Sequence, residues 1–267
     1  MDNQKVTIKI LLDMKAAGEK ITMLTCYDYL MASLLDQSGI DMMLVGDSVG
    51  NVLLGYDNTI PVTMEEMLHH CKTVTRAAKR ALVVGDMPFM SYQVSREEAV
   101  KNAGRFLKEA NVSAVKLEGG EEILDIIEKL VITGIPVMGH LGLTPQSVNV
   151  FGGYGLRGGS SEESVKMLND AKKIEEAGAF AIVLEKIPAV LAKQITSSLK
   201  IPTIGIGAGV NCDGQVLVTH DMLGLFEKFT PKFSKRYAEM AKEMKECFRN
   251  YVQEVKDKKF PSEEHSY

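Results

Sequence analysis

The chain has 267 residues, of which 45% are hydrophobic and 25% charged, and its formal net charge is −4. These values are typical of a globular protein and disfavour a disordered, collagen-like or coiled-coil chain. Its 31 basic and 35 acidic residues are scattered along the sequence, which argues against a surface built to bind nucleic acid.

The first predicted element is a short amphipathic helix, which Thr7 caps and Gly18 ends. Short apolar runs rich in β-branched residues then alternate with longer segments of helical periodicity. The runs that predict strands are 21–26, 42–46, 82–85, 114–117, 136–139, 179–184, 202–206 and, more weakly, 215–218. The segments that predict helices are 29–37, 64–79, 96–110, 121–133, 162–177, 189–198 and 233–256.

Eight predicted strands in 267 residues leave about 33 residues for each strand and its helix, which is the size of a βα repeat. Strands that are apolar on both faces and joined by helices are typical of parallel sheets. We therefore predict a single (β/α)8 TIM barrel with an extra N-terminal helix. A doubly wound open sheet is the alternative, although it usually shows a glycine-rich fingerprint after its first strand. The barrel is expected to span residues 1–257, followed by a polar tail over 258–267.

The predicted compartment is the cytoplasm. Residues 1–20 carry Lys9, Asp13 and Lys15 among their apolar positions, so they lack the uncharged core of a signal peptide. No run of 18 or more apolar residues predicts a membrane-spanning helix. The four cysteines lie far apart without a CxxC pair, which disfavours a zinc knuckle or a disulfide framework.

Polar side chains follow five successive predicted strands at their C-terminal ends. These residues are Asp47, Asp86, Glu118, His140 and Glu185. In a (β/α)8 barrel these strand ends form one mouth, where the active sites of this fold are built. A single acid after a strand is commonly a helix cap, but four acids and a histidine in this pattern favour a functional site. His140 is included as a supporting residue.

Lys116 is the second basic candidate. It stands two residues before Glu118, so both side chains point to the same side of their strand. A lysine directed into a barrel is costly unless a carboxylate or an anionic ligand compensates its charge. Lys116 is therefore expected to form a structural ion pair, to receive the acid group of a substrate, or to do both.

Asp47, Asp86 and Glu118 come from adjacent strands and are placed to share one cation, which would relieve their mutual repulsion. Oxygen ligands favour a hard ion such as Mg²⁺ over zinc. A 2-oxo acid would chelate such an ion and form a metal-stabilised enolate when the proton next to its carbonyl is removed. Glu185 is then available as the base, and Ser48 as a hydrogen-bond donor to the substrate carboxylate.

The segment 151–159 is dense in glycine and carries one tyrosine and one arginine. It predicts either a mobile loop over the mouth or a plain long connection. The segment 205–209, GIGAG, resembles a phosphate cradle. Close packing of a strand against a helix explains this second segment equally well.

Several sequence blocks, in one family's order, make the chain resemble the ketopantoate hydroxymethyltransferases. They fall within about residues 5–237 and include MLTCYDY, MLVGDSVGNVLLGYD, DMPFMSY, VKLEGG, GHLGLTPQSVN and CDGQVLVTHDMLG. The resemblance implies a (β/α)8 barrel that binds Mg²⁺ and transfers a one-carbon unit from 5,10-methylenetetrahydrofolate to 3-methyl-2-oxobutanoate. The product, 2-dehydropantoate, serves pantothenate biosynthesis. The resemblance also implies a homo-oligomer, typically a decamer.

The resemblance also assigns roles to individual residues. It implies metal ligation by Asp47, Asp86 and Glu118, and substrate contact by Asp47, Ser48, Asp86 and Lys116. Glu185 matches the family's proton acceptor. In the glycine loop, Gly155 stands where the family often has a lysine, so the residues that contact the folate are left open.

Two other functions stay open. One is another Mg²⁺-dependent 2-oxo-acid barrel, such as a carbon-carbon lyase of the isocitrate lyase type. Such a lyase normally carries a cysteine near the mouth, and Cys26, Cys71, Cys212 and Cys247 offer no obvious candidate. The other is a non-catalytic metabolite-binding barrel, which would not need Glu185 in addition to the ion ligands and Lys116.

Overall fold

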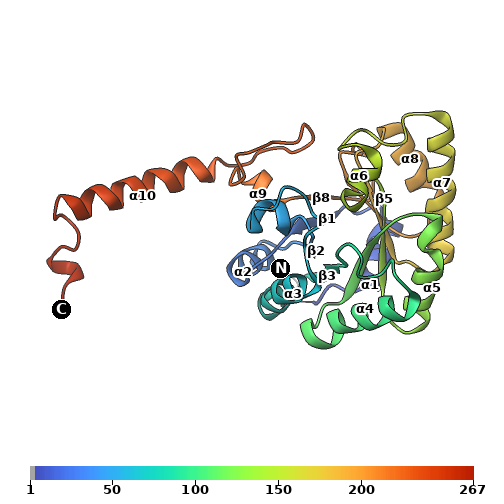
Figure 1. The fold of residues 1–267 in the computed structure, drawn as a ribbon, viewed down its shortest axis with the longest axis horizontal. Helices are drawn as coiled ribbons and strands as arrows, with labels where there is room; N and C mark the ends of the chain where they lie inside the picture. Colours follow the sequence, from blue (N-terminus) through green and yellow to red (C-terminus); the bar gives the residue numbers. More distant parts are fainter. Residues whose placement is uncertain (1–3) are drawn as a thin grey trace. The chain divides into compact units, whose positions relative to one another are not determined.

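A computed structural model describes residues 4–267; residues 1–3, with which the predicted barrel begins, lie outside the described part. Parallel strands form a closed barrel in which neighbours in sequence pair in order and the last strand pairs with the first (Figure 1). The strands are β1 (Ile21–Thr25), β2 (Met42–Val45), β3 (Leu82–Asp86), β4 (Ala114–Glu118), β5 (Val137–Gly142), β6 (Ala181–Glu185), β7 (Thr203–Ile206) and β8 (Gly214–Leu217). The predicted (β/α)8 barrel is confirmed.

Helices connect most of the strands and cover the barrel, whereas a loop without a helix joins β7 to β8. The predicted N-terminal helix is α1 (Ile8–Ala17), which precedes β1. The helices that follow are α2 (Tyr29–Gln37), α3 (Met64–Ala77), α4 (Arg96–Ala110), α5 (Leu124–Ile132), α6 (Val148–Phe151), α7 (Ser161–Glu176) and α8 (Ala189–Ser198). Shorter helical turns are η1 (Gly50–Leu54), η2 (Glu121–Ile123) and η3 (Pro145–Ser147).

Side-chain caps explain where several helices begin. The Thr7 hydroxyl accepts a hydrogen bond from the Ile10 N–H at the start of α1, and Gly18 ends that helix in the left-handed conformation. At the start of α3, Thr63 and Glu66 form a reciprocal capping box. These local signals fix both ends of α1 and the start of α3.

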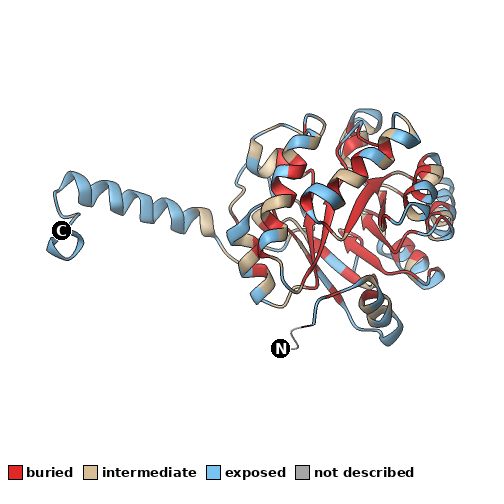
Figure 2. Cartoon of the chain, turned by 90° about the horizontal axis from the view of Figure 1, so that it is seen from below, coloured by how far each residue is buried: buried red, intermediate tan, exposed pale blue. Residues whose placement is uncertain are grey.

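Strands β2 to β7 are buried over most of their length, between the barrel interior and the surrounding helices, as Figure 2 shows in red. In β1 and β8 one residue each is exposed, Thr22 and Gln215. Gly85 in β3 shows how closely the two layers approach. A Cβ atom at this position would lie 2.5 Å from the Phe106 ring of α4. The glycine therefore lets α4 pack directly on β3, next to Asp86 at the strand end.

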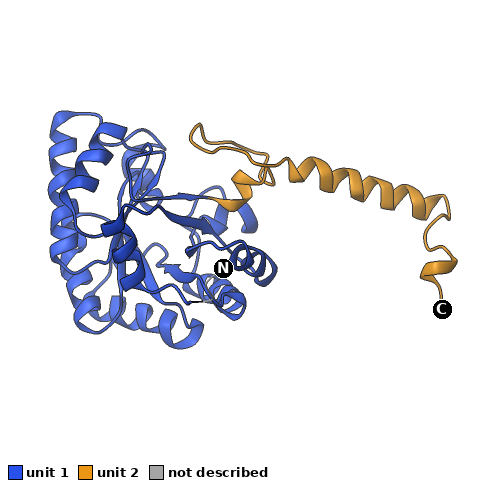
Figure 3. Cartoon of the chain, turned by 180° about the vertical axis from the view of Figure 1, so that it is seen from behind, with its two compact units in different colours: residues 1–217 blue, residues 218–267 orange. Residues whose placement is uncertain are grey.

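The chain divides into two compact units, Met1–Leu217 and Val218–Tyr267 (Figure 3). The second unit contains α9 (Thr219–Met222), α10 (Met240–Lys256) and η4 (Glu263–His265). Helix α10 begins seven residues later than the predicted start at 233. The backbone N–H of Tyr237 instead donates to the Met222 carbonyl, which holds the preceding segment in a non-helical path. The predicted boundary at residue 257 stays a prediction.

None of the helices within residues 4–267 is long and apolar enough to cross a membrane.

Candidate active site

The C-terminal ends of β2 to β6 bring the predicted site residues together. Asp47 follows β2, Asp86 ends β3, Lys116 and Glu118 are on β4, His140 is on β5, and Glu185 ends β6. The strand register places Asp86 level with Lys116, and Glu118 level with His140. All these residues are buried except Glu185, which is half-buried. The predicted convergence at one mouth is therefore present in the fold.

Lys116 forms ion pairs inside the barrel. Its Nζ lies 2.5 Å from Asp86 Oδ1 and 3.8 Å from Glu118 Oε1. Burial alone would lower the pKa of Lys116, but the charges of Asp86, Glu118 and Asp47 outweigh burial and raise this pKa above its ordinary value. The side chain therefore stays a charged ammonium, and it faces the same side as Glu118.

Asp47 and Asp86 are in direct contact, because the Asp47 backbone N–H donates to Asp86 Oδ2 at 3.2 Å. Burial raises the pKa of Asp47 well above its ordinary value, and the charges of Asp86 and Glu118 raise it further. Burial also raises the pKa of Asp86, although Lys116 acts against this change. The two aspartates thus lie in a buried region where additional positive charge is favourable.

His140 lies between two acids, with Nδ1 3.2 Å from Glu118 Oε1 and Nε2 3.3 Å from Glu185 Oε2. Burial and the charge of Lys116 act to lower the pKa of His140. Glu118 and Glu185 act more strongly in the opposite direction and raise that pKa to about 9. The imidazole is therefore protonated at neutral pH. The same contacts lower the pKa of Glu118 although burial alone would raise it.

Sequence reasoning missed Gln146, which contacts two of the predicted metal ligands. Its backbone N–H donates to Glu118 Oε2, and its side-chain Nε2 donates to Asp47 Oδ2, both at 3.0 Å. It also missed Tyr92, whose hydroxyl contacts both the Glu118 carbonyl and Gln146 Oε1 at 3.0 Å. Gln146 lies in the block GHLGLTPQSVN and Tyr92 in the block DMPFMSY, and both blocks carry the family resemblance. Membership in these blocks was the one sequence signal that could have indicated the two residues.

Ser48, the predicted substrate contact, is half-buried next to Asp47. Its Oγ lies 2.8 Å from the hydroxyl of Tyr27, a fully buried residue that sequence reasoning did not single out. The Tyr27 carbonyl in turn lies 2.7 Å from Nδ1 of the buried His70. These contacts join the segments after β1 and β2 and restrict the orientation of the Ser48 hydroxyl.

Comparison with known proteins adds an independent observation. The family model described as ketopantoate hydroxymethyltransferase matches residues 5–263. The chain belongs to the ketopantoate hydroxymethyltransferase family. A relative from Carboxydothermus hydrogenoformans, named 3-methyl-2-oxobutanoate hydroxymethyltransferase, is 60% identical over 98% of this chain and 95% of its own length. A second relative of the same name, from Syntrophus aciditrophicus, is 58% identical over 99% of this chain and 97% of its own length. The predicted resemblance is confirmed, and with it the prediction of a hydroxymethyltransferase enzyme.

Solved structures with lower sequence identity share the barrel fold of this family member. Phosphonopyruvate hydrolase in complex with oxalate and Mg²⁺ has a TM-score of 0.62 at 13% identity, and covers 97% of this chain and 92% of its own. A 2,3-dimethylmalate lyase of the PEP mutase/isocitrate lyase superfamily has a TM-score of 0.61 at 14% identity, with coverages of 96% and 89%. At these identities the likeness shows the fold alone. The sequence identity separates the two groups: it is 58–60% to the hydroxymethyltransferases and 14% to the lyase.

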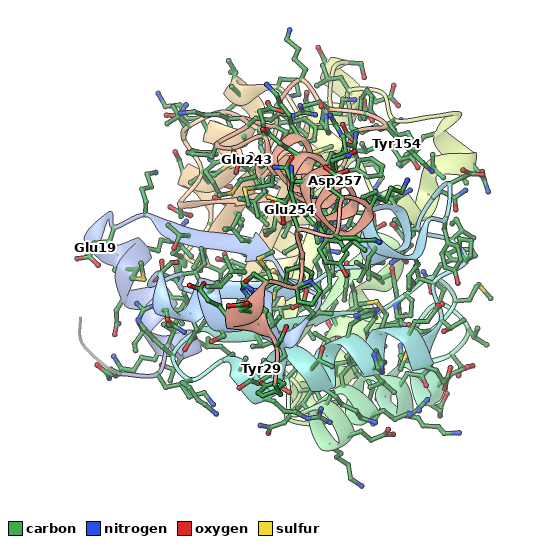
Figure 4. The ribbon with its side chains drawn as sticks, turned by 90° about the vertical axis from the view of Figure 1, so that its left-hand side faces the viewer. Glu19, Tyr29, Tyr154, Glu243, Glu254 and Asp257 are labelled. Atoms are coloured by element: carbon green, nitrogen blue, oxygen red, sulfur yellow. The ribbon has the colours of Figure 1, made fainter. Side chains whose placement is uncertain are left out.

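The glycine loop of this family member is tied to the residue after Glu185. The Arg157 N–H donates to the Lys186 carbonyl at 3.1 Å, and Lys186 Nζ donates to the Tyr154 carbonyl. Tyr154, labelled in Figure 4, is half exposed. Partial burial and the charges of Asp47 and Glu185 raise the pKa of Tyr154, which indicates that its hydroxyl lies within the electrostatic influence of the mouth. These contacts do not decide between the two predicted roles of the loop, a mobile lid and a plain connection.

The donor set of the mouth suits a hard cation. Among residues 4–267, no three histidine, cysteine, aspartate or glutamate side chains are already arranged as the ligands of a metal ion. The carboxylates of the mouth nevertheless outnumber its two cationic side chains, Lys116 and His140. Oε1 of Glu118 is buried and makes no well-aligned hydrogen bond with the described residues. An excess of buried carboxylate oxygens is the environment that favours a divalent ion with oxygen ligands.

Proposed function

We propose that this enzyme transfers a hydroxymethyl group from 5,10-methylenetetrahydrofolate to 3-methyl-2-oxobutanoate, giving 2-dehydropantoate, with Mg²⁺ as its metal. The observation that carries the proposal is the convergence of buried carboxylates and one buried lysine at the mouth of the barrel. Relatives that match nearly the whole chain bear the name of this transferase, and their name supplies the substrate.

Mg²⁺ would be held by Asp47, Asp86 and Glu118. The proposal is supported by the oxygen-only donors, by the excess of buried negative charge, and by the carboxylate oxygen of Glu118 that lacks a well-aligned hydrogen bond. A protein of the same fold has been solved with Mg²⁺ and oxalate. When bound, the ion would polarise the keto group of the oxo acid and so make the proton on carbon 3 more acidic.

Lys116 and Ser48 would bind the carboxylate of the oxo acid. Lys116 is charged and buried, and a charged donor forms a stronger hydrogen bond to a carboxylate than a neutral donor does. Ser48 has its hydroxyl oriented by Tyr27. Asp47 and Asp86 would complete the substrate contacts. These groups fix the acid end of the substrate and leave carbon 3 to point toward another part of the mouth.

Glu185 would remove the proton from carbon 3. Unlike the other acids it is only half-buried, and its Oε2 lies against the protonated His140. The bond between carbon 3 and hydrogen would break, the proton would move to the Glu185 carboxylate, and the electron pair would form a new bond to the methylene carbon of the folate. The two carbon-nitrogen bonds that join this methylene carbon to the folate would break, a water molecule would supply the hydroxyl group, and tetrahydrofolate would leave. His140 supports this step by holding the carboxylate through an ion pair. Glu185 is therefore the proposed catalytic base, and His140 its positioning residue.

The deciding experiment supplies the enzyme with Mg²⁺, 3-methyl-2-oxobutanoate and 5,10-methylenetetrahydrofolate, and detects 2-dehydropantoate by mass spectrometry. We expect product only when all three are present. A parallel assay follows exchange of the carbon 3 proton with deuterated solvent, which needs no folate. Exchange without product formation in the complete mixture would overturn the assignment of the folate as one-carbon donor. Cytoplasmic location and homo-oligomeric assembly stay predictions.

A further inference from the structure

Gln146 lies in η3, directly after β5, and reaches two carboxylates that follow other strands. Its backbone N–H donates to Glu118 Oε2 and its side-chain Nε2 donates to Asp47 Oδ2, each at 3.0 Å. One residue of the loop after β5 therefore connects the end of β4 to the segment after β2. The two hydrogen bonds come from different parts of the residue, so a side-chain substitution removes only the bond to Asp47.

The surroundings of Gln146 fix the orientation of its amide. Nε2 also donates to the Met87 carbonyl at 2.9 Å, and a backbone carbonyl only accepts hydrogen bonds. Oε1 accepts from Gln93 Nε2 at 3.2 Å and from the Tyr92 hydroxyl at 3.0 Å. The residue is 4% exposed. A buried amide with all of its hydrogen-bonding groups engaged is held rigidly, since any rotation would leave polar groups unpaired.

The hydrogen bonds of Gln146 use only one oxygen of each carboxylate. On Glu118 the bond uses Oε2. The other oxygen, Oε1, is buried and lies 3.2 Å from His140 Nδ1, but it makes no well-aligned hydrogen bond among residues 4–267. On Asp47 the bond uses Oδ2, which leaves Oδ1 for another partner. We propose that Gln146 is a positioning residue that holds Asp47 and Glu118 in the orientation in which they bind a divalent cation. This inference rests on the proposed function, which assigns Mg²⁺ to these carboxylates.

A glutamine suits this role better than a charged residue. A lysine at position 146 would neutralise the carboxylates and compete with the cation. A glutamate there would place another negative charge against Asp47 and the Met87 carbonyl. The neutral amide orients the carboxylate by donating a hydrogen bond and leaves its charge for the ion. Partners of this kind, which orient metal ligands, typically change metal affinity by roughly 10- to 100-fold when they are removed.

The test is an isothermal calorimetric titration of the folded enzyme with Mg²⁺ alone. Gln146→Met keeps the length of the side chain and removes its hydrogen bonds, so we expect roughly 10- to 100-fold weaker Mg²⁺ binding. Gln93→Met is the matched control, because the exposed Gln93 donates to the same amide but contacts neither carboxylate. It is expected to bind Mg²⁺ as the wild type does. Asp86→Asn removes a proposed metal ligand, so a loss of Mg²⁺ binding in this variant would show that the titration detects the proposed site.

Two readouts separate positioning from a merely structural role. In the deuterium-exchange assay, Gln146→Met is expected to raise the Mg²⁺ concentration for half-maximal rate while the rate at saturating Mg²⁺ stays near that of the wild type. Wild-type Mg²⁺ affinity in folded Gln146→Met, with binding lost in Asp86→Asn, overturns this inference and leaves the proposed function intact. Wild-type enzyme that binds no Mg²⁺ overturns both. If Gln146→Met does not fold, Gln146→Asn, which keeps an amide but is too short to reach Asp47, is expected to show the same loss.

Discussion

Burial and charged neighbours together decide the protonation states of Lys116, His140 and Asp47 in the mouth of the barrel. Lys116 stays cationic because Asp86 and Glu118 outweigh the effect of burial. His140 stays cationic because Glu118 and Glu185 lie on its two ring nitrogens. Asp47, by contrast, lies among other acids, and its pKa is raised. Substitutions of these residues therefore change the charge balance of the mouth as well as a single contact.

Lys116→Met tests substrate binding. The variant keeps much of the side-chain stem and deletes the ammonium, so an anionic substrate meets uncompensated acids. Loss of a charge-assisted bond of about 1.5–3 kcal/mol corresponds to roughly 10- to 150-fold weaker binding of 3-methyl-2-oxobutanoate. Calorimetry at saturating Mg²⁺ measures this change. An unchanged dissociation constant would show that Lys116 serves only its ion pair with Asp86.

Glu185→Gln tests the base. The amide preserves shape and hydrogen bonding but does not accept the proton, so we expect carbon 3 exchange to slow by about 10²- to 10⁴-fold. Binding of Mg²⁺ and of the oxo acid should persist, because Glu185 belongs to neither predicted set of ligands. Exchange at the wild-type rate would exclude Glu185 as the base and favour a metal-bound hydroxide.

Asp86→Asn tests the metal site. The substitution removes a ligand charge and the partner of Lys116, so Mg²⁺ and oxo-acid binding should weaken together. Because loss of an orienting partner already costs roughly 10- to 100-fold, we expect about 100-fold or more for the loss of a direct ligand. Calorimetry with each ligand is the measurement, and unchanged affinities for both would contradict the assignment.

The charged residues of the site were predictable from sequence, whereas the amide and hydroxyl that support them were not. Asp86 and Glu118 end their strands and Asp47 stands two residues after β2, so a barrel topology alone brings them together. Gln146 reaches the same place only because η3 turns its backbone N–H and its side chain back toward β4 and β2. Such a contact depends on a loop conformation, which no periodicity in the sequence encodes.

A glycine at the end of β5 allows close backbone contact with the end of β6. Gly142, at the end of β5, has a φ of +99°, and a Cβ atom there would lie 2.1 Å from the Glu185 carbonyl oxygen. The neighbouring Leu143 N–H donates to that same carbonyl at 2.8 Å. The backbone of Glu185 is therefore held by contact with β5 rather than by its own strand alone.

Gly142→Ala is expected to destabilise the fold by about 1–3 kcal/mol through backbone strain, and to slow carbon 3 exchange because Glu185 must move away. Gly104→Ala is the matched control, since Gly104 lies inside α4 with no neighbouring atom within 4 Å of the added Cβ. It should stabilise the protein by up to about 1 kcal/mol without changing exchange. Urea unfolding measures the stabilities. Equal effects of the two substitutions would contradict this account of β5 and β6.

Alternating strand and helix patterns in the sequence predicted the order of elements in the barrel correctly. The sequence pattern did not predict the correct start of α10. Its amphipathic periodicity extends back to 233, while the helix begins at Met240. The backbone bonds from Tyr237 to Met222 and from Met240 to Leu223 decide this boundary. These hydrogen bonds join segments that are separated along the chain, so the local sequence pattern does not predict them.

The raised pKa of His140 predicts a pH dependence of the stability of the protein. The folded-state pKa of about 9 exceeds the ordinary 6.5, so the stabilisation is fully present below about pH 6.5 and is lost as pH rises through 9. With 1.36 kcal/mol for each pKa unit, the loss is at most about 3 kcal/mol. Urea unfolding of metal-free enzyme between pH 6 and 10 measures it. His140→Gln should flatten this dependence, and a profile unchanged in that variant would assign it to another group.

The pairing of β1 with β8 has a consequence for how copies of this chain can associate. A sheet that closes on itself has no edge strand, so no unpaired row of backbone N–H and C=O groups is available for a strand of another molecule to extend. Any assembly of this enzyme must therefore be built through side chains on its outer surface, which include the exposed Thr22 of β1 and Gln215 of β8, and not by extending the sheet. Amino-acid changes that alter assembly should consequently lie at exposed side chains and not at the buried residues of the barrel strands.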